Sequence, residues 1–342
     1  MIRRDLKSFF IWVRSSQAPL YAAPIYIVLG ILVLGYRPDL HEYIMSFATR
    51  LFYAGVMWGQ VPGWSGAMPH PVTSVLVGLF EILAAVFVLI DPWLIDFHGY
   101  SWQLFLWIAS LAHVAQYMSR GLGRTMRTAP NIVTVIGLLY SLTSPATGYM
   151  SILMFPLASV YSLLLRVDPA RRKKKITVNQ ILVFALIFLI SIALAPVLLR
   201  ELYLLPMLVL FILIPSIGGG DEIYKIGTNV SKIFALLSFP LSFFVSWGVA
   251  LHFALIGFLA VTMLSLCTPL LIPGIIWREI PRISVSESYF IAGLGALSAI
   301  LRFLGGLFMN RSLVMISGIL VIIVTIYYVY KILKMPKVSV KI

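Results

Sequence analysis

Residues 178–199 read VNQILVFALIFLISIALAPVLL and contain no charged side chain. A helix of this length rises about 1.5 Å per residue and therefore crosses the hydrocarbon core of a bilayer, which is about 30 Å thick. Similar apolar runs recur from Ser16 to Lys331, and 61% of the 342 residues are apolar while 11% are charged. A soluble domain of this size cannot bury so much apolar surface. We therefore expect an all-α integral membrane protein with the lipid bilayer as its solvent.

Breaks at Pro, Gly and charged residues divide the chain into about twelve predicted transmembrane helices. They cover residues 16–35, 43–61, 71–90, 101–119, 130–142, 148–165, 178–199, 202–216, 229–246, 248–271, 288–307 and 312–330. The fifth and eighth are short. A basic loop at 166–177 separates a six-helix half, 1–165, from a second six-helix half, 178–342, and no sequence repeat relates the two. We expect one polytopic membrane domain.

Lys and Arg predict the orientation, because they concentrate on the cytoplasmic side of membrane proteins. With the N-terminus inside, most of the 26 Lys and Arg residues fall on cytoplasmic segments, including Lys225 and Lys232, whereas the loop from Asp91 to Asp96 is acidic and lies outside. Both termini are therefore expected in the cytoplasm and the protein in the cell membrane. The net charge of +14 is scattered over short loops, which indicates contact with anionic lipid and not with nucleic acid.

Charged and imidazole side chains at membrane depth need an explanation. Arg50 and Glu81 lie near the middle of consecutive predicted helices, so they are expected to form an ion pair. The pair either fixes the register of the helices or lies on a proton path, and we favour the structural role. His113, with Gln116 one turn away, is expected to hydrogen-bond across helices.

Two further histidines lie at similar predicted depth near the outer face. His41 precedes the second helix and His252 begins the tenth, and both helices run from outside to inside. Two imidazoles from different helices can hold a haem iron, and imidazole is also a ligand for copper. The structural alternative is a polar residue satisfied at a helix contact. Arg302 either faces a haem propionate or extends to the membrane interface.

Several stretches, in order along the chain, resemble the NnrS family of twelve-span membrane proteins. They are LHEYIMSF at 40–47 with VPGWSG at 61–66, APNIVTVIGLL at 129–139, GGGDEIYKIGT at 218–228, LHFALIGFLAVTM at 251–263 and AILRF at 299–303. The family is described as haem- and copper-containing and is associated with nitric oxide metabolism. The resemblance implies that His41 and His252 are ligands of haem iron or copper. The chain also departs from the family pattern, because at least four family histidines are missing. At the corresponding places it has Ser16, Asp39, the run 145–148 and the run 271–274. One haem b with two histidine ligands is the most that the remaining residues support, and the missing histidines argue against an additional copper site.

Three functions follow as alternatives. The first is a redox protein that carries electrons through haem b or binds nitric oxide. The second is a non-catalytic hydrophobic anchor of an archaeal respiratory cytochrome b complex, with cytochrome or iron–sulfur subunits as partners. The third is a transporter, favoured by Pro and Gly breaks at Pro196, Pro206, Pro215 and Gly218–Gly220. A redox carrier or membrane subunit is expected in preference to an enzyme, and the single cysteine, Cys267, excludes an internal disulfide.

Overall fold

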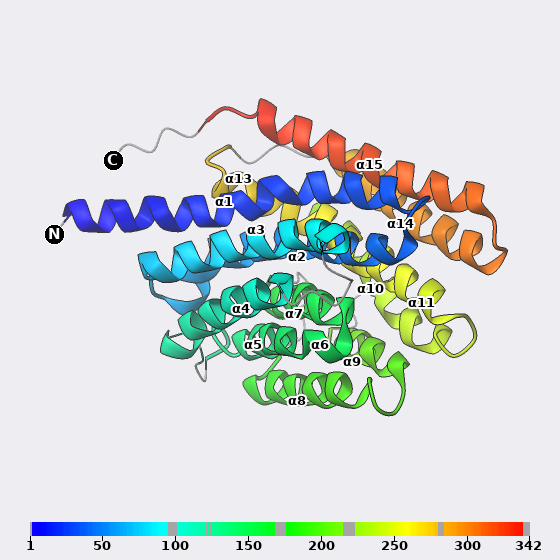
Figure 1. The fold of residues 1–342 in the computed structure, drawn as a ribbon, viewed down its shortest axis with the longest axis horizontal. Coiled ribbons are helices and arrows are strands. Elements are labelled where there is room, and N and C mark those ends of the chain that lie inside the picture. Colours follow the sequence, from blue (N-terminus) through cyan, green and yellow to red (C-terminus); the bar gives the residue numbers. More distant parts are fainter. Residues whose placement is uncertain are drawn as a thin grey trace. The chain divides into compact units, whose positions relative to one another are not determined.

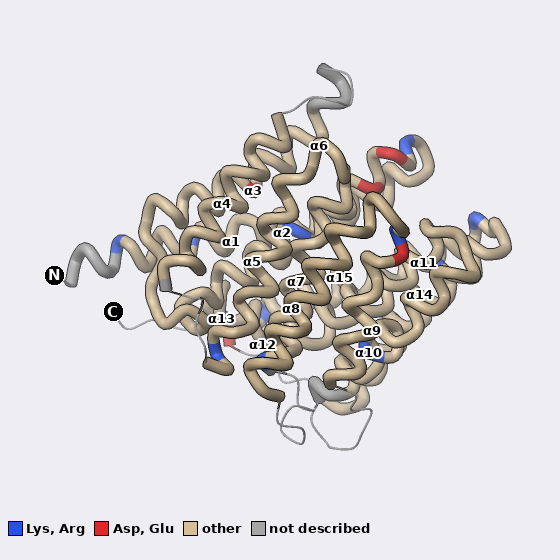
Figure 2. Tube along the Cα trace, turned by 90° about the horizontal axis from the view of Figure 1, so that it is seen from below, with Lys and Arg blue, Asp and Glu red and all other residues tan. Residues whose placement is uncertain are grey.

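The computed structural model describes residues 2–94, 101–120, 122, 125–167, 176–214, 223–279 and 284–337. These residues are helical, with no strand among them beyond an isolated bridge between Arg278 and Lys337. The expected all-α class is therefore confirmed. The chain forms two compact units, Met1–Ser162 and Leu163–Ile342. Most of the helical trace carries no charge, as Figure 2 shows.

Six helices of the described residues are long and apolar enough to cross a membrane. They are Lys7–Val33, Pro71–Ile90, Tyr149–Arg166, Trp247–Cys267, Val285–Leu307 and Arg311–Lys334. All six coincide with predicted spans, and the remaining predicted spans also contain helix, but in shorter or more polar pieces. The membrane character of the chain thus follows from these six helices.

The first unit contains α1 (Ile2–Val33), α2 (Pro38–Ser65), α3 (Pro71–Leu94), α4 (Ser101–Arg120), α5 (Asn131–Tyr140), η1 (Ser141–Thr143), α6 (Ser144–Thr147) and most of α7 (Tyr149–Val167). In Figure 1, α1, α2 and α3 run side by side. The first helix begins at Ile2, earlier than the predicted start at Ser16. Helix α2 begins with Pro38, which suits a first-turn position because its missing N–H needs no partner there.

Glycines allow the helices of the first unit to approach closely. A Cβ at Gly55 would lie 2.7 Å from the Ser16 carbonyl oxygen, and one at Gly78 would lie 2.8 Å from the Ser15 Cα. A Cβ at Gly137 would lie 2.4 Å from the Cβ of Ala158. Small residues at such crossings are typical of membrane helices, where packing and not hydrophobic burial drives association. The contacts bring α1 against α2 and α3, and α5 against α7.

The second unit contains α8 (Val178–Leu194), η3 (Arg200–Leu204), α9 (Leu205–Leu213), α10 (Ile223–Leu241), α11 (Trp247–Ala254), the π-helical segments η4 (Leu255–Ala260) and η5 (Met263–Cys267), α12 (Thr268–Leu270), α13 (Ile272–Ile275), α14 (Val285–Leu307) and α15 (Arg311–Lys334). Figure 1 shows α14 and α15 as a hairpin. Helix α8 ends at Leu194, before the predicted end at Leu199, because Pro196 cannot continue the backbone hydrogen bonding.

Candidate functional site

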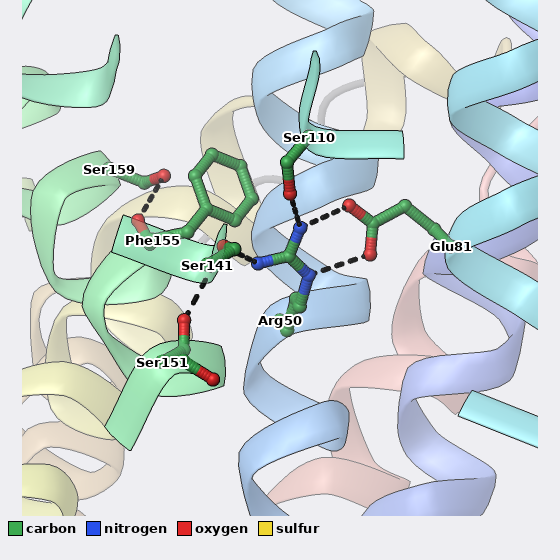
Figure 3. Close-up of polar contacts among 7 residues, drawn as sticks. All are labelled: Arg50, Glu81, Ser110, Ser141, Ser151, Phe155 and Ser159. Atoms are coloured by element: carbon green, nitrogen blue, oxygen red, sulfur yellow. Dashed lines mark hydrogen bonds and ion pairs between the residues drawn. The ribbon is translucent and has the colours of Figure 1, made fainter. Parts of the chain in front are cut away.

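The centre of the first unit holds a fully buried ion pair between α2 and α3. Arg50 Nε donates to Glu81 Oε2 and Arg50 Nη2 donates to Glu81 Oε1, each at 2.8 Å (Figure 3). Both side chains are 0% exposed. Two parallel N–H···O bonds match the planar guanidinium to the carboxylate and fix the orientation of both groups. The predicted contact between Arg50 and Glu81 is therefore present.

Two serines from other elements complete the coordination of Arg50. Its Nη2 also donates to Ser110 Oγ of α4 at 2.8 Å, and its Nη1 donates to Ser141 Oγ of η1 at 2.9 Å. The Phe155 ring of α7 covers the guanidinium, with 5.1 Å from Arg50 Cζ to the ring centroid. One arginine thus joins α2, α3, α4, η1 and α7 (Figure 3). The network is electrically neutral as a whole, which makes two charges tolerable in the interior.

His113 lies one turn beyond Ser110 on α4 and is enclosed by aromatic rings. Its ring centroid is 4.8 Å from that of Trp58, 5.4 Å from that of Tyr117 and 5.6 Å from that of Phe155. Neither ring nitrogen has a hydrogen-bond partner among the residues that the structure describes. The expected hydrogen bond across helices is therefore not made by that part of the chain, and aromatic packing positions the ring instead.

His41 is buried in the first turn of α2. Its Nδ1 is 2.7 Å from the carbonyl oxygen of Gly30 in α1. A carbonyl oxygen only accepts, so Nδ1 carries a proton, and in the neutral ring the lone pair is then on Nε2. A hydrogen bond of this kind orients imidazoles that act as metal ligands. A Cβ at Gly30 would lie 2.5 Å from Met45 Sδ, so a larger residue here would require the Met45 side chain to move.

His252 and Arg302 lie together in the second unit. His252 Nδ1 is 2.7 Å from the Gly248 carbonyl oxygen, one turn earlier in α11, which again places the proton on Nδ1. Arg302 Nη2 of α14 then donates to His252 Nε2 at 3.2 Å. None of the described carboxylates forms an ion pair with Arg302. The structure thus brings together two of the three residues predicted to hold haem.

The predicted pairing of His41 with His252 joins the two units and stays a prediction. Across the described ranges, no three or more His, Cys, Asp or Glu side chains gather in a group suited to a metal ion. Two imidazoles alone are the donor set of a haem with two histidine ligands. His41 and His252 are each the kind of ligand that a haem b with two histidine ligands would need.

Sequence reasoning missed two features of the interior. Lys232 was assigned to the cytoplasmic segments, but it lies within α10 and is 0% exposed. Ser74, Trp58 and Thr134 were not singled out, although each is buried with a polar side-chain atom that has no partner among the described residues. A sequence signal existed for two of them, because Ser74 lies seven residues before Glu81 and Thr134 seven before Ser141, hence on the same helix faces.

Comparison of the chain with known protein families, with curated proteins and with solved structures gave no match. The functional argument therefore depends on the residues of this chain.

Proposed function

We propose that the chain is an NnrS-like membrane protein of twelve spans that holds haem b near the outer face and transfers electrons. Each predicted apolar run contains helix, and among the described residues six helices are long and apolar enough to cross a membrane. Short connections, such as those between α1 and α2 and between α14 and α15, make consecutive helices antiparallel. With the N-terminus inside, an even number of spans places the C-terminus in the cytoplasm too, in agreement with the distribution of Lys and Arg.

The observation that carries the haem proposal is the shared hydrogen bonding of His41 and His252. Each Nδ1–H donates to a backbone carbonyl oxygen at 2.7 Å, so each imidazole is held in the tautomer with its lone pair on Nε2. That tautomer is the one that ligates iron through Nε2.

Arg302 supplies the third element of the proposed site. It is the cation adjacent to His252, and it has no carboxylate partner among the described residues. With haem bound, Arg302 would be the cation placed to neutralise a propionate, because it lies beside the proposed ligand His252. Haem b would supply one-electron redox chemistry between its ferric and ferrous states. The residues of this chain would hold the ring, neutralise a propionate and exclude water.

Two histidine ligands leave no open position on the iron, and for this reason we propose electron transfer in preference to nitric oxide binding. An electron carrier of this kind needs donors and acceptors. We propose that they are cytochrome or iron–sulfur subunits of a respiratory complex in the cell membrane, to which the chain serves as a haem-bearing hydrophobic anchor.

One observation favours transport as the second candidate. The segment from Trp247 to Leu270 contains two π-helical stretches, Leu255–Ala260 and Met263–Cys267. Such stretches free backbone carbonyls and occur often at functional sites. Beside this segment packs α10, which carries the buried Lys232.

Optical spectra test the proposal. Full-length protein, expressed with added haem precursor and purified in detergent, is expected to show a Soret band and sharp α-bands after reduction with dithionite. His41→Ala and His252→Ala are each expected to lose these bands, whereas His70→Ala, on an exposed histidine, should retain them. A featureless spectrum from folded wild-type protein would exclude the haem proposal and make transport the leading candidate.

A further inference from the structure

Several buried polar atoms of the first unit have no hydrogen-bond partner among the described residues, and five of them belong to four fully buried side chains toward one end of the unit. These five atoms are Ser74 Oγ, Trp58 Nε1, Thr134 Oγ1 and both ring nitrogens of His113. All four side chains are 0% exposed. A buried polar atom without a hydrogen bond is costly and uncommon, and the usual partner of such atoms is an internal water molecule.

These atoms lie on the helices that build the Arg50–Glu81 network. Trp58 follows Arg50 on α2, Ser74 precedes Glu81 on α3 and His113 follows Ser110 on α4. Thr134 precedes Ser141 at the end of α5. At a rise of 1.5 Å per residue, His113 lies about 4.5 Å from the level of the ion pair, Ser74 and Thr134 about 10 Å, and Trp58 about 12 Å.

Along their own helices, all four side chains lie on the same side of the ion pair, toward the same end of the unit. Short connections make α2 antiparallel to α3, and the shared ligation of Arg50 places the middle of α4 and the end of α5 at the level of that pair. The C-terminal ends of α2 and α4 therefore lie with the N-terminal ends of α3 and α5. The contact between the rings of His113 and Trp58, 4.8 Å between centroids, joins two of the four positions directly.

Other hydroxyls in the same unit show how a serine in a membrane helix is normally satisfied. Ser159 Oγ donates to the Phe155 carbonyl oxygen at 2.8 Å, and Ser65 Oγ donates to the Val61 carbonyl oxygen at 2.9 Å. Ser74 and Thr134 could make the same bond to the residue four positions earlier, but they do not. Their hydroxyls therefore have no acceptor among the described residues.

From this arrangement we propose that the first unit binds a chain of internal water molecules, held by Ser74, Trp58, His113 and Thr134, that leads to the Arg50–Glu81 pair. Water fits the mixture of groups, because the Trp58 indole only donates, the neutral His113 ring donates at one nitrogen and accepts at the other, and the hydroxyls do both. A hydrogen-bonded file of this kind is a route by which a proton reaches Glu81. The proposal does not depend on haem.

The test is nuclear magnetic resonance of the full chain, labelled with ¹⁵N at tryptophan, in lipid nanodiscs. The indole N–H of Trp58, assigned through Trp58→Phe, is expected to show a magnetisation-transfer cross-peak with water. Trp107 is the matched control, because its Nε1 donates to Ser144 Oγ at 3.0 Å, and it should show none. The variant His113→Phe keeps an aromatic ring but removes both nitrogens, and it should abolish the Trp58 cross-peak.

Two results would overturn the proposal. A Trp58 indole without a water cross-peak in the folded wild-type protein would show that no water is bound there. A cross-peak that persists unchanged in His113→Phe would show that the water does not bridge the two side chains, so that no continuous file exists. Because the signal of Trp107 reports folding in the same spectra, a loss caused by misfolding is recognised directly.

Discussion

Two arginines at membrane depth have very different surroundings in this protein. Arg50, in the first unit, is fully buried and donates both to the two oxygens of Glu81 and to the hydroxyls of Ser110 and Ser141. Arg302, in the second unit, is half-buried and donates to the neutral imidazole of His252. The first charge is neutralised within the protein, whereas the second has no carboxylate in the described part of the chain.

The difference separates a structural charge from one that is available to a ligand. A buried cation with its carboxylate and hydroxyls in place has no remaining charge to offer to a bound molecule. A cation that lies beside a neutral imidazole can still stabilise an anion such as a propionate. Changes at Arg50 or Glu81 should therefore act mainly on folding, and changes at Arg302 mainly on binding.

The largest expected effect follows removal of one partner of the buried pair. Glu81→Gln leaves the Arg50 guanidinium buried without a counter-charge, and we expect a loss of about 3–5 kcal/mol in the free energy of unfolding. Reversible unfolding in mixed micelles measures this loss of free energy.

The double variant Arg50→Met/Glu81→Leu is the matched control, because it removes both charges together. It should lose less stability than Glu81→Gln, since no uncompensated charge remains. If the single and double variants unfold alike, the pair is not coupled and the structural role assigned to it is wrong.

A smaller effect is expected at the two serines that accept hydrogen bonds from Arg50. Ser110→Ala and Ser141→Ala each remove one acceptor from a charged donor, which should cost about 1–3 kcal/mol. Ser159→Ala is the comparison, because its hydroxyl bonds only a carbonyl of its own helix and is expected to matter less. Equal losses of stability in all three alanine variants would contradict the prediction that the two serines bonded to Arg50 matter more than Ser159.

Replacement of Arg302 tests the role of the second arginine, which is expected to affect binding more than folding. Arg302→Gln removes one half-buried hydrogen bond to a neutral acceptor, and we expect it to lower stability by less than about 1.5 kcal/mol. Haem retention through gel filtration should nevertheless fall, because a propionate loses its cation. A large loss of stability with full haem retention would reverse the roles of the two arginines.

The smallest effect is expected at an ion pair in the turn between α1 and α2. Arg37 Nη2 lies 2.9 Å from Asp39 Oδ2, with the side chains 43% and 50% exposed. The hydrogen bond from Arg37 holds the pKa of Asp39 below its usual value of 3.8. Any stabilisation is therefore complete above that usual value and is lost as the pH falls through the lowered pKa.

At neutral pH solvent screens this exposed pair, so Asp39→Asn should leave stability at pH 7 unchanged within error. A pH series of unfolding curves for the variant and the wild type checks this expectation. A clear loss at pH 7 would mean that burial is not what distinguishes the Arg50 pair from the Arg37 pair.

Much of the fold could be predicted because it depends on patterns along the chain. Apolar runs broken by Pro and Gly locate the helices within a few residues, and the charges at Arg50 and Glu81 indicate their own pairing. The first helix could not be bounded correctly, because Ile2–Arg14 is polar enough to resemble a tail and yet continues the helix. The π-helical stretches of η4 and η5 also have no sequence signal of their own.

The surroundings of the candidate sites were less predictable, because they depend on contacts between distant helices. The hydrogen bond from Arg302 to His252 joins residues 50 positions apart, and the bond from His41 to Gly30 depends on how the α1–α2 hairpin packs. The burial of Lys232 was missed because a lysine near a predicted helix end normally extends to the interface. Its place in the interior is set by the packing of α10.

Electron paramagnetic resonance of the oxidised protein tests the haem assignment most directly, because ferric iron between two imidazoles is low-spin. We predict a low-spin signal in the wild type, its loss in His41→Ala and in His252→Ala, and its retention in His113→Phe. A low-spin signal that survives both single alanine variants, or that disappears only in His113→Phe, would contradict the assignment of His41 and His252 as the ligands.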